Sequence, residues 1–130
     1  MLPFSIELKP GLPLVTQILF AVKKAVVSGR LKPGSKFPSV RQLSLELRIN
    51  PNTAHRVVMD LVAEGILVTT PGVGSLVASR QASDPRERAD LLGGDLERIA
   101  VEARQLGLSL DELQSSLASH WRKLGGDLSP

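Results

Sequence analysis

Two helix-start signals lie close together in the sequence, and they restrict how the chain between them can fold. Ser39-Val40-Arg41-Gln42 is a capping box, in which the serine hydroxyl and the glutamine amide satisfy free N–H groups of a new helix. Asn50-Pro51 is a second start, with Asn as the cap and Pro at the first helical position. The first of these helices must therefore be short, over residues 39–47, and the second follows almost at once, over 51–64.

A longer helix precedes this pair and a hairpin follows it. Apolar residues recur with a helical period over residues 14–27. After Gly65 the period changes from 3.6 to 2, so residues 66–70 and 75–78 are predicted as two short strands around a turn. This order of elements predicts a mainly α fold with a small β-hairpin, a winged helix-turn-helix domain over residues 1–79.

The composition is that of a small helical protein with an aliphatic core. The 130 residues suffice for a domain of about 80 residues and a helical appendage. Aromatic residues make up only 3%, so the core must consist of Leu, Val, Ile and Ala. The chain has no cysteine, and His55 and His120 lie far apart in sequence. We therefore expect neither disulfides nor a metal site.

Charge is divided unevenly along the chain. Residues 1–80 carry 10 Lys/Arg against 4 Asp/Glu, a net charge of +6, whereas residues 81–130 carry 6 against 9, a net charge of −3. A polyanionic partner is therefore expected on the first part. No apolar run reaches the roughly 18 residues that cross a bilayer, and residues 1–9 show no secretory signal pattern. We expect a cytoplasmic, nucleoid-associated protein that does not enter a membrane.

The second part, residues 80–130, is predicted to form two amphipathic helices after a polar linker at 81–84. Asp84-Pro85 starts the first helix, and Ser109 starts the second. Gly93-Gly94 interrupts the first helix, where each glycine costs about 1 kcal/mol relative to alanine, so we expect a kink there or a start later than Pro85. Two such helices have too little interior to be stable alone, and their apolar faces need either the first domain or a second chain.

The expected DNA-reading element is the helix that begins after Asn50. In a winged helix-turn-helix this helix places its leading residues against base edges in the major groove. Asparagine can pair with adenine, and arginine with guanine or phosphate. The residues so placed are Asn50, Asn52, Thr53, His55 and Arg56.

The sequence also resembles a known family. Four runs carry the resemblance to the GntR family of bacterial regulators: GSKFPSVRQL at 34–43, NPNT at 50–53 with Arg56, EGIL at 64–67, and GVGS at 72–75. The NPNT run and the short tail resemble its YtrA-type subfamily. The resemblance implies a repressor that binds a pseudo-palindromic operator as a homodimer. It also implies DNA contacts at Arg41, Asn50, Asn52, Thr53, His55 and Gly72, to which we add Arg56, Lys36 and Ser39.

The tail of YtrA-type members is mainly a dimerisation element, so the resemblance implies the same for residues 80–130. The apolar residues that we expect at the dimer interface are Leu92, Leu96, Ile99, Leu113, Leu117 and Trp121. The chain has no room for the larger effector or pyridoxal-phosphate domains of other members. We therefore expect no cofactor and no enclosed ligand pocket, and leave a small-molecule effector open.

Two other functions remain as alternatives. The predicted wing, residues 69–74, carries no Arg or Lys, although family wings usually do, which favours a winged helix used for protein interaction. An enzyme is a distant third, because the sequence shows no Ser/His/Asp set, no paired carboxylates and no phosphate-cradling glycine loop.

Overall fold

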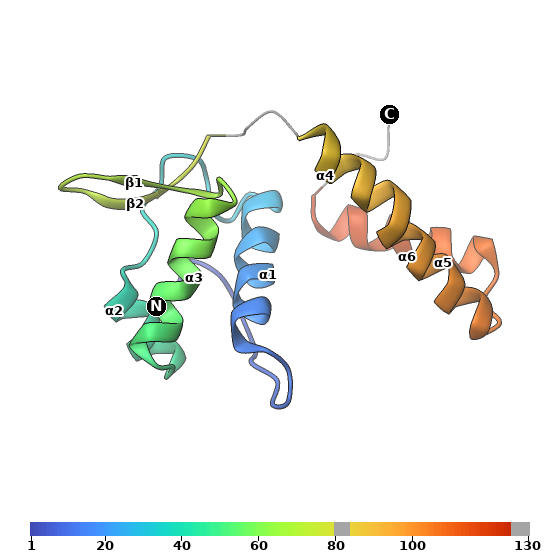
Figure 1. The fold of residues 1–130 in the computed structure, drawn as a ribbon, viewed down its shortest axis with the longest axis horizontal. Helices are drawn as coiled ribbons and strands as arrows, with labels where there is room; N and C mark the ends of the chain where they lie inside the picture. The colour runs from blue at the N-terminus through green and yellow to red at the C-terminus, as the bar shows by residue number, and fades with distance from the viewer. Residues whose placement is uncertain (80–83, 126–130) are drawn as a thin grey trace. The chain divides into compact units, whose positions relative to one another are not determined.

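The computed structural model describes residues 1–79 and 84–125 and separates the chain into two compact units, Met1–Gln81 and Ala82–Pro130 (Figure 1). The polar linker predicted at 81–84 lies, apart from Asp84, outside the described residues. No described helix is long and apolar enough to span a membrane.

The first unit contains the predicted winged helix-turn-helix. Its elements are α1 (Leu14–Val27), α2 (Val40–Leu47), α3 (Pro51–Ala63), β1 (Leu67–Thr70) and β2 (Gly74–Val77). Helix α3 packs against both α1 and α2, and it lies between them in Figure 1. The two strands pair antiparallel, with Leu67 opposite Val77 and Thr70 opposite Gly74. The prediction of a mainly helical fold with one hairpin is confirmed.

A mainly aliphatic core joins these elements, but the expectation of a core made of Leu, Val, Ile and Ala alone was wrong, because Phe4 and Phe37 are also buried in it. Each helix and each strand contributes side chains with almost no solvent exposure, and the largest are Ile18, Val22, Leu43, Val57, Leu61 and Leu67. Burial of such a side chain contributes roughly 1.5–3 kcal/mol. The core therefore fixes the orientation of α3 against α2 and the hairpin.

The loop before α2 pairs with strand β2 of the hairpin. The sequence did not predict this pairing. The Phe37 N–H donates to the Ser75 carbonyl at 2.9 Å, and the Val77 N–H donates to the Ser35 carbonyl at 2.9 Å. Lys36 forms an isolated antiparallel bridge with Leu76 between these two bonds. The loop is thus attached to β2 as a short third strand.

The N-terminal segment is also part of this unit. Phe4 is buried, and its ring stacks on that of Phe37 with 6.0 Å between the centroids and 4° between the planes. Gln17 on α1 anchors the loop that precedes this helix. Its side chain accepts a hydrogen bond from the Lys9 N–H at 2.8 Å and donates one to the Lys9 carbonyl at 3.0 Å.

The second unit consists of α4 (Pro85–Asp90), a π-helical turn η1 (Leu91–Asp95), α5 (Leu96–Gln105) and α6 (Leu110–Lys123). Asp84 caps the first of these by accepting from the Arg86 N–H at 2.8 Å. The helix therefore starts at Pro85, and the alternative of a later start was wrong. The interruption predicted at Gly93-Gly94 is the π turn, which follows α4 directly, with no loop between them.

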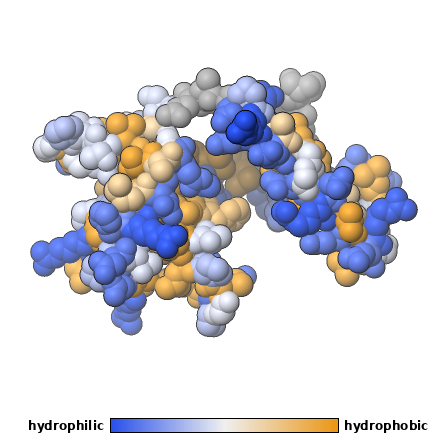
Figure 2. All heavy atoms as spheres, in the orientation of Figure 1, coloured by the Kyte–Doolittle hydropathy of each residue, from blue (hydrophilic) through white to orange (hydrophobic). Residues whose placement is uncertain are grey.

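Large apolar side chains remain at the surface of the second unit. Among the residues expected at a dimer interface, five are exposed and Leu113 is half-buried; the exposed five are Leu92, Leu96, Ile99, Leu117 and Trp121. Among the described residues of this unit, Ala103 is the only apolar residue that is buried. Figure 2 shows apolar residues at the surface of both units.

Candidate nucleic-acid interface

The helix pair α2–α3 is held by side-chain caps at both helix starts. The Ser39 hydroxyl accepts from the Gln42 N–H at 3.1 Å, and Asn50 Oδ1 accepts from the Asn52 N–H at 2.8 Å. The amide of Gln42 donates to Glu46 Oε2 at 2.9 Å, one turn further along α2. Each cap satisfies one of the free N–H groups at its helix start. The first turns of α2 and α3 are thereby well defined.

The connection between the two helices uses a left-handed residue. Arg48 has φ = 54° and ψ = 50°, and it is the C-cap of α2. Ser44 closes the turn, since its hydroxyl donates to the Ile49 carbonyl at 2.8 Å and its carbonyl accepts from the Ile49 N–H at 3.1 Å. The tight turn brings the start of α3 next to α2.

Helix α3 divides into a buried face and an exposed face. Ala54, Val57, Val58 and Leu61 point into the core. Most of the predicted DNA-reading residues lie on the other side: Asn50, Asn52, His55 and Arg56 are exposed, and Thr53 is half-buried. The leading turn of α3 therefore presents the predicted residues to solvent.

Sequence reasoning missed Met59 on this face. Its side chain is 51% exposed, and it follows His55 by one helical turn. The signal was available, because Met59 is an apolar residue placed off the buried stripe of α3. An apolar side chain at this position suits contact with the methyl group of thymine.

Arg56 makes one weak ion pair within α3. Its Nε lies 3.9 Å from Asp60 Oδ2, and the two side chains are 74% and 40% exposed. Pairs of this kind contribute roughly 0.3–0.5 kcal/mol, so little energy is lost if Arg56 turns to another anion. The guanidinium can therefore reach a phosphate or a base edge.

Two of the remaining predicted residues, Lys36 and Ser39, line a groove in the same unit. This groove has a volume of about 550 Å³ and lies between the loop before α2, the start of α2 and the wing. Lys36, Ser39 and Gln42 line it from the loop and α2, and Val73 and Gly74 line it from the wing. Arg41 is exposed on the first turn of α2. The pairing of the loop with β2 thus brings Lys36 and the wing together.

The wing turn is formed by residues 71–73. Gly72 has φ = +76°, which side chains rarely adopt, and the Val73 N–H donates to the Thr70 carbonyl at 3.1 Å. Gly72 is exposed, and Val73 is 46% exposed. The tip is therefore apolar and compact, without a cation.

Positive charge predominates over residues 34–60, which carry Lys36, Arg41, Arg48 and Arg56 against Glu46 and Asp60. The Met1 amino group lies 2.6 Å from Glu46 Oε1. Hydrogen bonds from this ammonium and from Gln42 hold the pKa of the Glu46 carboxyl below its ordinary value. Within the described residues, no group of three or more His, Cys, Asp or Glu side chains is placed to hold a metal ion.

Comparisons with known proteins agree with this geometry. Residues 14–77 match the model of the family described as bacterial regulatory proteins, gntR family. The chain is 29% identical over 110 residues to the HTH-type transcriptional repressor YtrA of Bacillus subtilis (strain 168), a match that covers 84% of this chain and 85% of that protein.

Two solved structures are also similar. A transcriptional antiterminator from Listeria monocytogenes EGD-e superposes with a TM-score of 0.84 at 27% identity, covering 98% of this chain and 96% of the other. The DNA-binding domain of AraR, in complex with operator ORX1, gives a TM-score of 0.50 at 25% identity, covering 56% of this chain and 93% of that domain.

Proposed function

Because the chain belongs to the GntR family of bacterial regulatory proteins, with relatives of the YtrA type, we propose that it binds a specific DNA operator as a homodimer and represses transcription from it. The relatives are transcription regulators and not enzymes. The observation that carries the proposal is the exposed leading turn of α3, held on the helix pair by the caps at Ser39 and Asn50.

We assign base reading to the exposed face of α3. Asn52 can pair with adenine through both atoms of its amide, and Arg56 can bind guanine or a phosphate. Thr53 and His55 complete the edge that faces the major groove, and Met59 adds an apolar contact one turn later. A major groove about 12 Å wide admits a helix in this way.

Phosphate contacts are assigned to the start of α2 and the loop before it. Arg41 and Lys36 supply positive charge, and Ser39 stands at the helix start, where the remaining N–H groups favour an anion. Gly72 at the wing tip lets the backbone approach the minor groove, with Val73 as an apolar neighbour. The wing then contributes shape and van der Waals contact rather than charge.

The homodimer is assigned to the second unit. Its exposed apolar side chains need cover, and a second copy of the same unit provides it; those expected at the interface are Leu92, Leu96, Ile99, Leu113, Leu117 and Trp121. A symmetric dimer presents two recognition helices related by a two-fold axis, so its operator has two half-sites of inverted sequence. Occupancy of that operator near a promoter would exclude polymerase from it.

The proposed function requires no cofactor and places the protein in the cytoplasm, where the DNA is. Selection of bound duplexes from a random pool tests it. We expect an enriched motif with inverted half-sites that is bound by a dimer. A plot of the logarithm of the binding constant against the logarithm of the salt concentration should be linear, with a slope of about −0.9 per phosphate neutralised. Failure to enrich any motif would refute sequence-specific binding.

The apolar wing favours one second candidate, a protein-interaction module. Its turn, residues 71–73, exposes Val73 and carries no cation. In that case the purified protein would retard no enriched duplex and would instead retain a defined protein partner. A Val73→Asp substitution would then weaken partner binding, since it places a charge in an apolar contact.

A further inference from the structure

Two adjacent glycines lie inside the long helical run of the second unit. Gly93 and Gly94 belong to the π turn η1, between α4 and α5, and neither has the left-handed φ that favours glycine. A Cβ added at either position would meet no atom within 4 Å beyond its chain neighbours and the backbone of its own helix. Neither the backbone conformation nor packing within the chain therefore requires glycine at these two positions.

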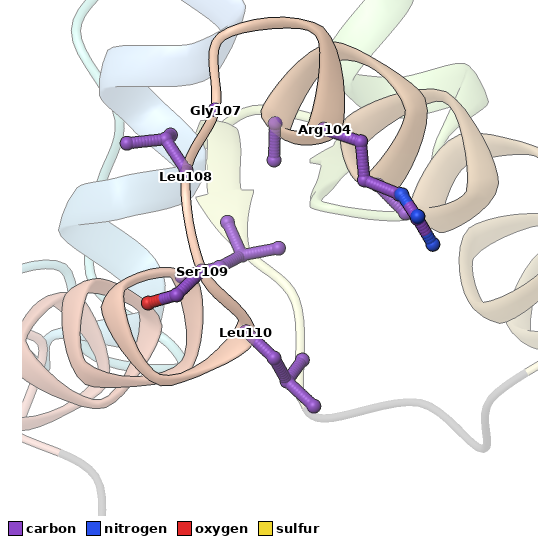
Figure 3. Close-up of a pocket in the computed structure, with 8 residues that line it drawn as sticks. Arg104, Gly107, Leu108, Ser109 and Leu110 are labelled. Carbon is purple, nitrogen blue, oxygen red and sulfur yellow. The ribbon is translucent and has the colours of Figure 1, made fainter.

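Gly107, in the connection between α5 and α6, is a glycine of the opposite kind. Its φ is +75°, which side chains rarely adopt. Hydrogen bonds fix the connection on both sides of it, since the Leu108 N–H donates to the Ala103 carbonyl at 2.9 Å and the Ser109 hydroxyl accepts from the Glu112 N–H at 3.1 Å. Figure 3 shows Gly107, Leu108 and Ser109 leading from α5 into α6 along the edge of a groove of about 540 Å³. This corner is thus well defined, and its glycine has a structural reason.

The π turn is the weakest part of the helical run from α4 to α5. Glycine weakens a helix because it loses more conformational freedom on folding than any other residue. A π turn holds one residue more than an α turn, and such turns occur mostly singly inside α-helices. η1 combines both features within Leu91–Asp95. The run is therefore easiest to bend, or to re-form with α-helical hydrogen bonds, at η1.

Helix α4 is held in place by this turn and not by apolar packing. It has six residues, and none of them is buried. A helix of this length is not stable alone in water, so α4 depends on continuing from η1. Helix α5, in contrast, buries Ala103 beside the corner with α6. A change at η1 would therefore redirect α4 without exposing a buried apolar side chain.

We propose that η1 is a hinge, at which α4 changes direction relative to α5 so that one dimer can bind operators with different distances between their half-sites. This inference rests on the proposed DNA-binding homodimer, in which the second unit joins the two copies and α4 is the helix next to the DNA-reading unit in sequence. When a π turn re-forms as an α turn, the helix before it rotates by about 100° and shifts by about 1.5 Å. One extra base pair between two half-sites rotates them by about 34° and separates them by about 3.4 Å. Two hinges, one in each copy, can share a change of this size.

Two spin labels across the hinge measure its motion without DNA. The chain has no cysteine, so Glu87→Cys on α4 and Glu102→Cys on α5, both at exposed positions, provide the only two labelling sites. A rigid helix would hold these positions about 22 Å apart along its axis. Pulsed electron paramagnetic resonance, with an excess of unlabelled chain, reports this distance within one copy. We expect a broad distribution that becomes at least about twofold narrower when Gly93→Ala and Gly94→Ala are added together.

A second variant and a control accompany this measurement. Deletion of Gly94 removes the extra residue of the π turn, so it should narrow the distribution in the same way. Ser116→Ala is the matched control, because it strengthens a helix at an exposed position of α6 and leaves η1 unchanged. Its distribution should stay as broad as that of the original sequence. Circular dichroism checks that the helices of each variant remain formed.

A series of operators tests what the hinge does in DNA binding. The half-sites of the enriched motif are placed at the selected spacing and at spacings one or two base pairs longer or shorter. The alanine pair at 93 and 94 should bind the selected spacing within about threefold of the original protein. At the altered spacings it should lose at least about tenfold more affinity than the original loses, whereas Ser116→Ala should follow the original throughout.

The outcomes separate this inference from the proposed function. Narrower distance distributions together with lost binding at altered spacings support the hinge. An unchanged distribution for the alanine pair overturns it, whether or not the protein binds DNA, and unchanged tolerance of the altered spacings overturns its role at the operator. A dimer that the alanine pair weakens by more than about tenfold, measured by sedimentation, also overturns it, because the glycines would then serve the close approach of a second chain. A protein that enriches no operator refutes the proposed function, while the spin labels still decide whether η1 moves.

Discussion

Asn50 and Asn52 are joined by a hydrogen bond in which the Asn52 N–H donates to the Asn50 side-chain oxygen at 2.8 Å. The bond uses the one acceptor atom of the Asn50 amide, and the residue itself is exposed. Asn50 can therefore still donate to a phosphate, whereas pairing with adenine through both amide atoms would require its oxygen to accept a second hydrogen bond beside the cap. Asn52 keeps both atoms of its own amide for that purpose.

Substitution should separate the two asparagines. Asn50→Ala removes the cap and should lower the free energy of unfolding by about 1 kcal/mol, measured by urea denaturation. Asn52→Ala should leave unfolding nearly unchanged, cost roughly 1–3 kcal/mol in operator binding and relax the base preference at one position per half-site. Asn50→Ser, which retains a cap, is the control for stability. An equal loss on every duplex for Asn52→Ala would contradict its base-reading role.

Lys36 should behave differently from Asn52, because a phosphate contact carries no sequence information. Lys36→Ala should weaken binding to all duplexes alike and lower the log–log salt slope by about 1 per substituted contact. Lys24→Ala is the matched control, since Lys24 is exposed on the last turn of α1 and does not line the groove beside the wing. Fluorescence anisotropy over a salt series checks both. A sequence-dependent loss for Lys36→Ala would contradict the assignment.

The left-handed turn at Arg48 should be stabilised by glycine. A left-handed conformation costs a residue with a side chain roughly 1–2 kcal/mol, and glycine adopts it without that cost. Arg48→Gly should therefore be more stable than Arg48→Ala by about 1 kcal/mol in thermal or urea unfolding. Both variants lose the same charge, so the comparison isolates the backbone. Equal stability of the two would mean that the turn adopts another conformation.

Phe4 should be as important for stability as a residue of the helical core. Its ring is buried against Phe37, so Phe4→Ala should lower the free energy of unfolding by roughly 3–5 kcal/mol. Phe20 on α1 is 68% exposed and provides the matched control, because Phe20→Ala removes the same ring from the surface. We expect its effect to stay within about 0.5 kcal/mol. A small effect of Phe4→Ala would show that the N-terminal segment is not tied to the core.

What could be predicted from the sequence was determined locally. The caps at Ser39, Asn50, Asp84 and Ser109 depend on residues within three positions, and each cap is present in the structure. The buried stripe of α3 follows from its helical period in the same way. These local signals sufficed to place the leading turn of α3 at the surface.

What was missed depends on contacts between distant parts of the chain. Phe4 is buried because Phe37, far along the sequence, provides a surface for its ring. The loop at 34–37 becomes a strand only because β2 offers unpaired backbone groups. The π turn at 91–95 is a different case. The Gly93-Gly94 pair predicted an interruption of the helix, but neither the composition nor the apolar period of this segment indicated that the interruption would be a π turn.

The pairing of residues 34–37 with β2 limits how this domain can adjust to its target. Since the loop leads directly into α2, a shift of the wing relative to α2 would require these backbone hydrogen bonds to break. In the proposed complex, the spacing between α3 in one groove and the wing in the next is therefore set by the protein, and the duplex has to conform. Sites whose local width or twist differs from that spacing should be bound less tightly even where every contacted base is correct.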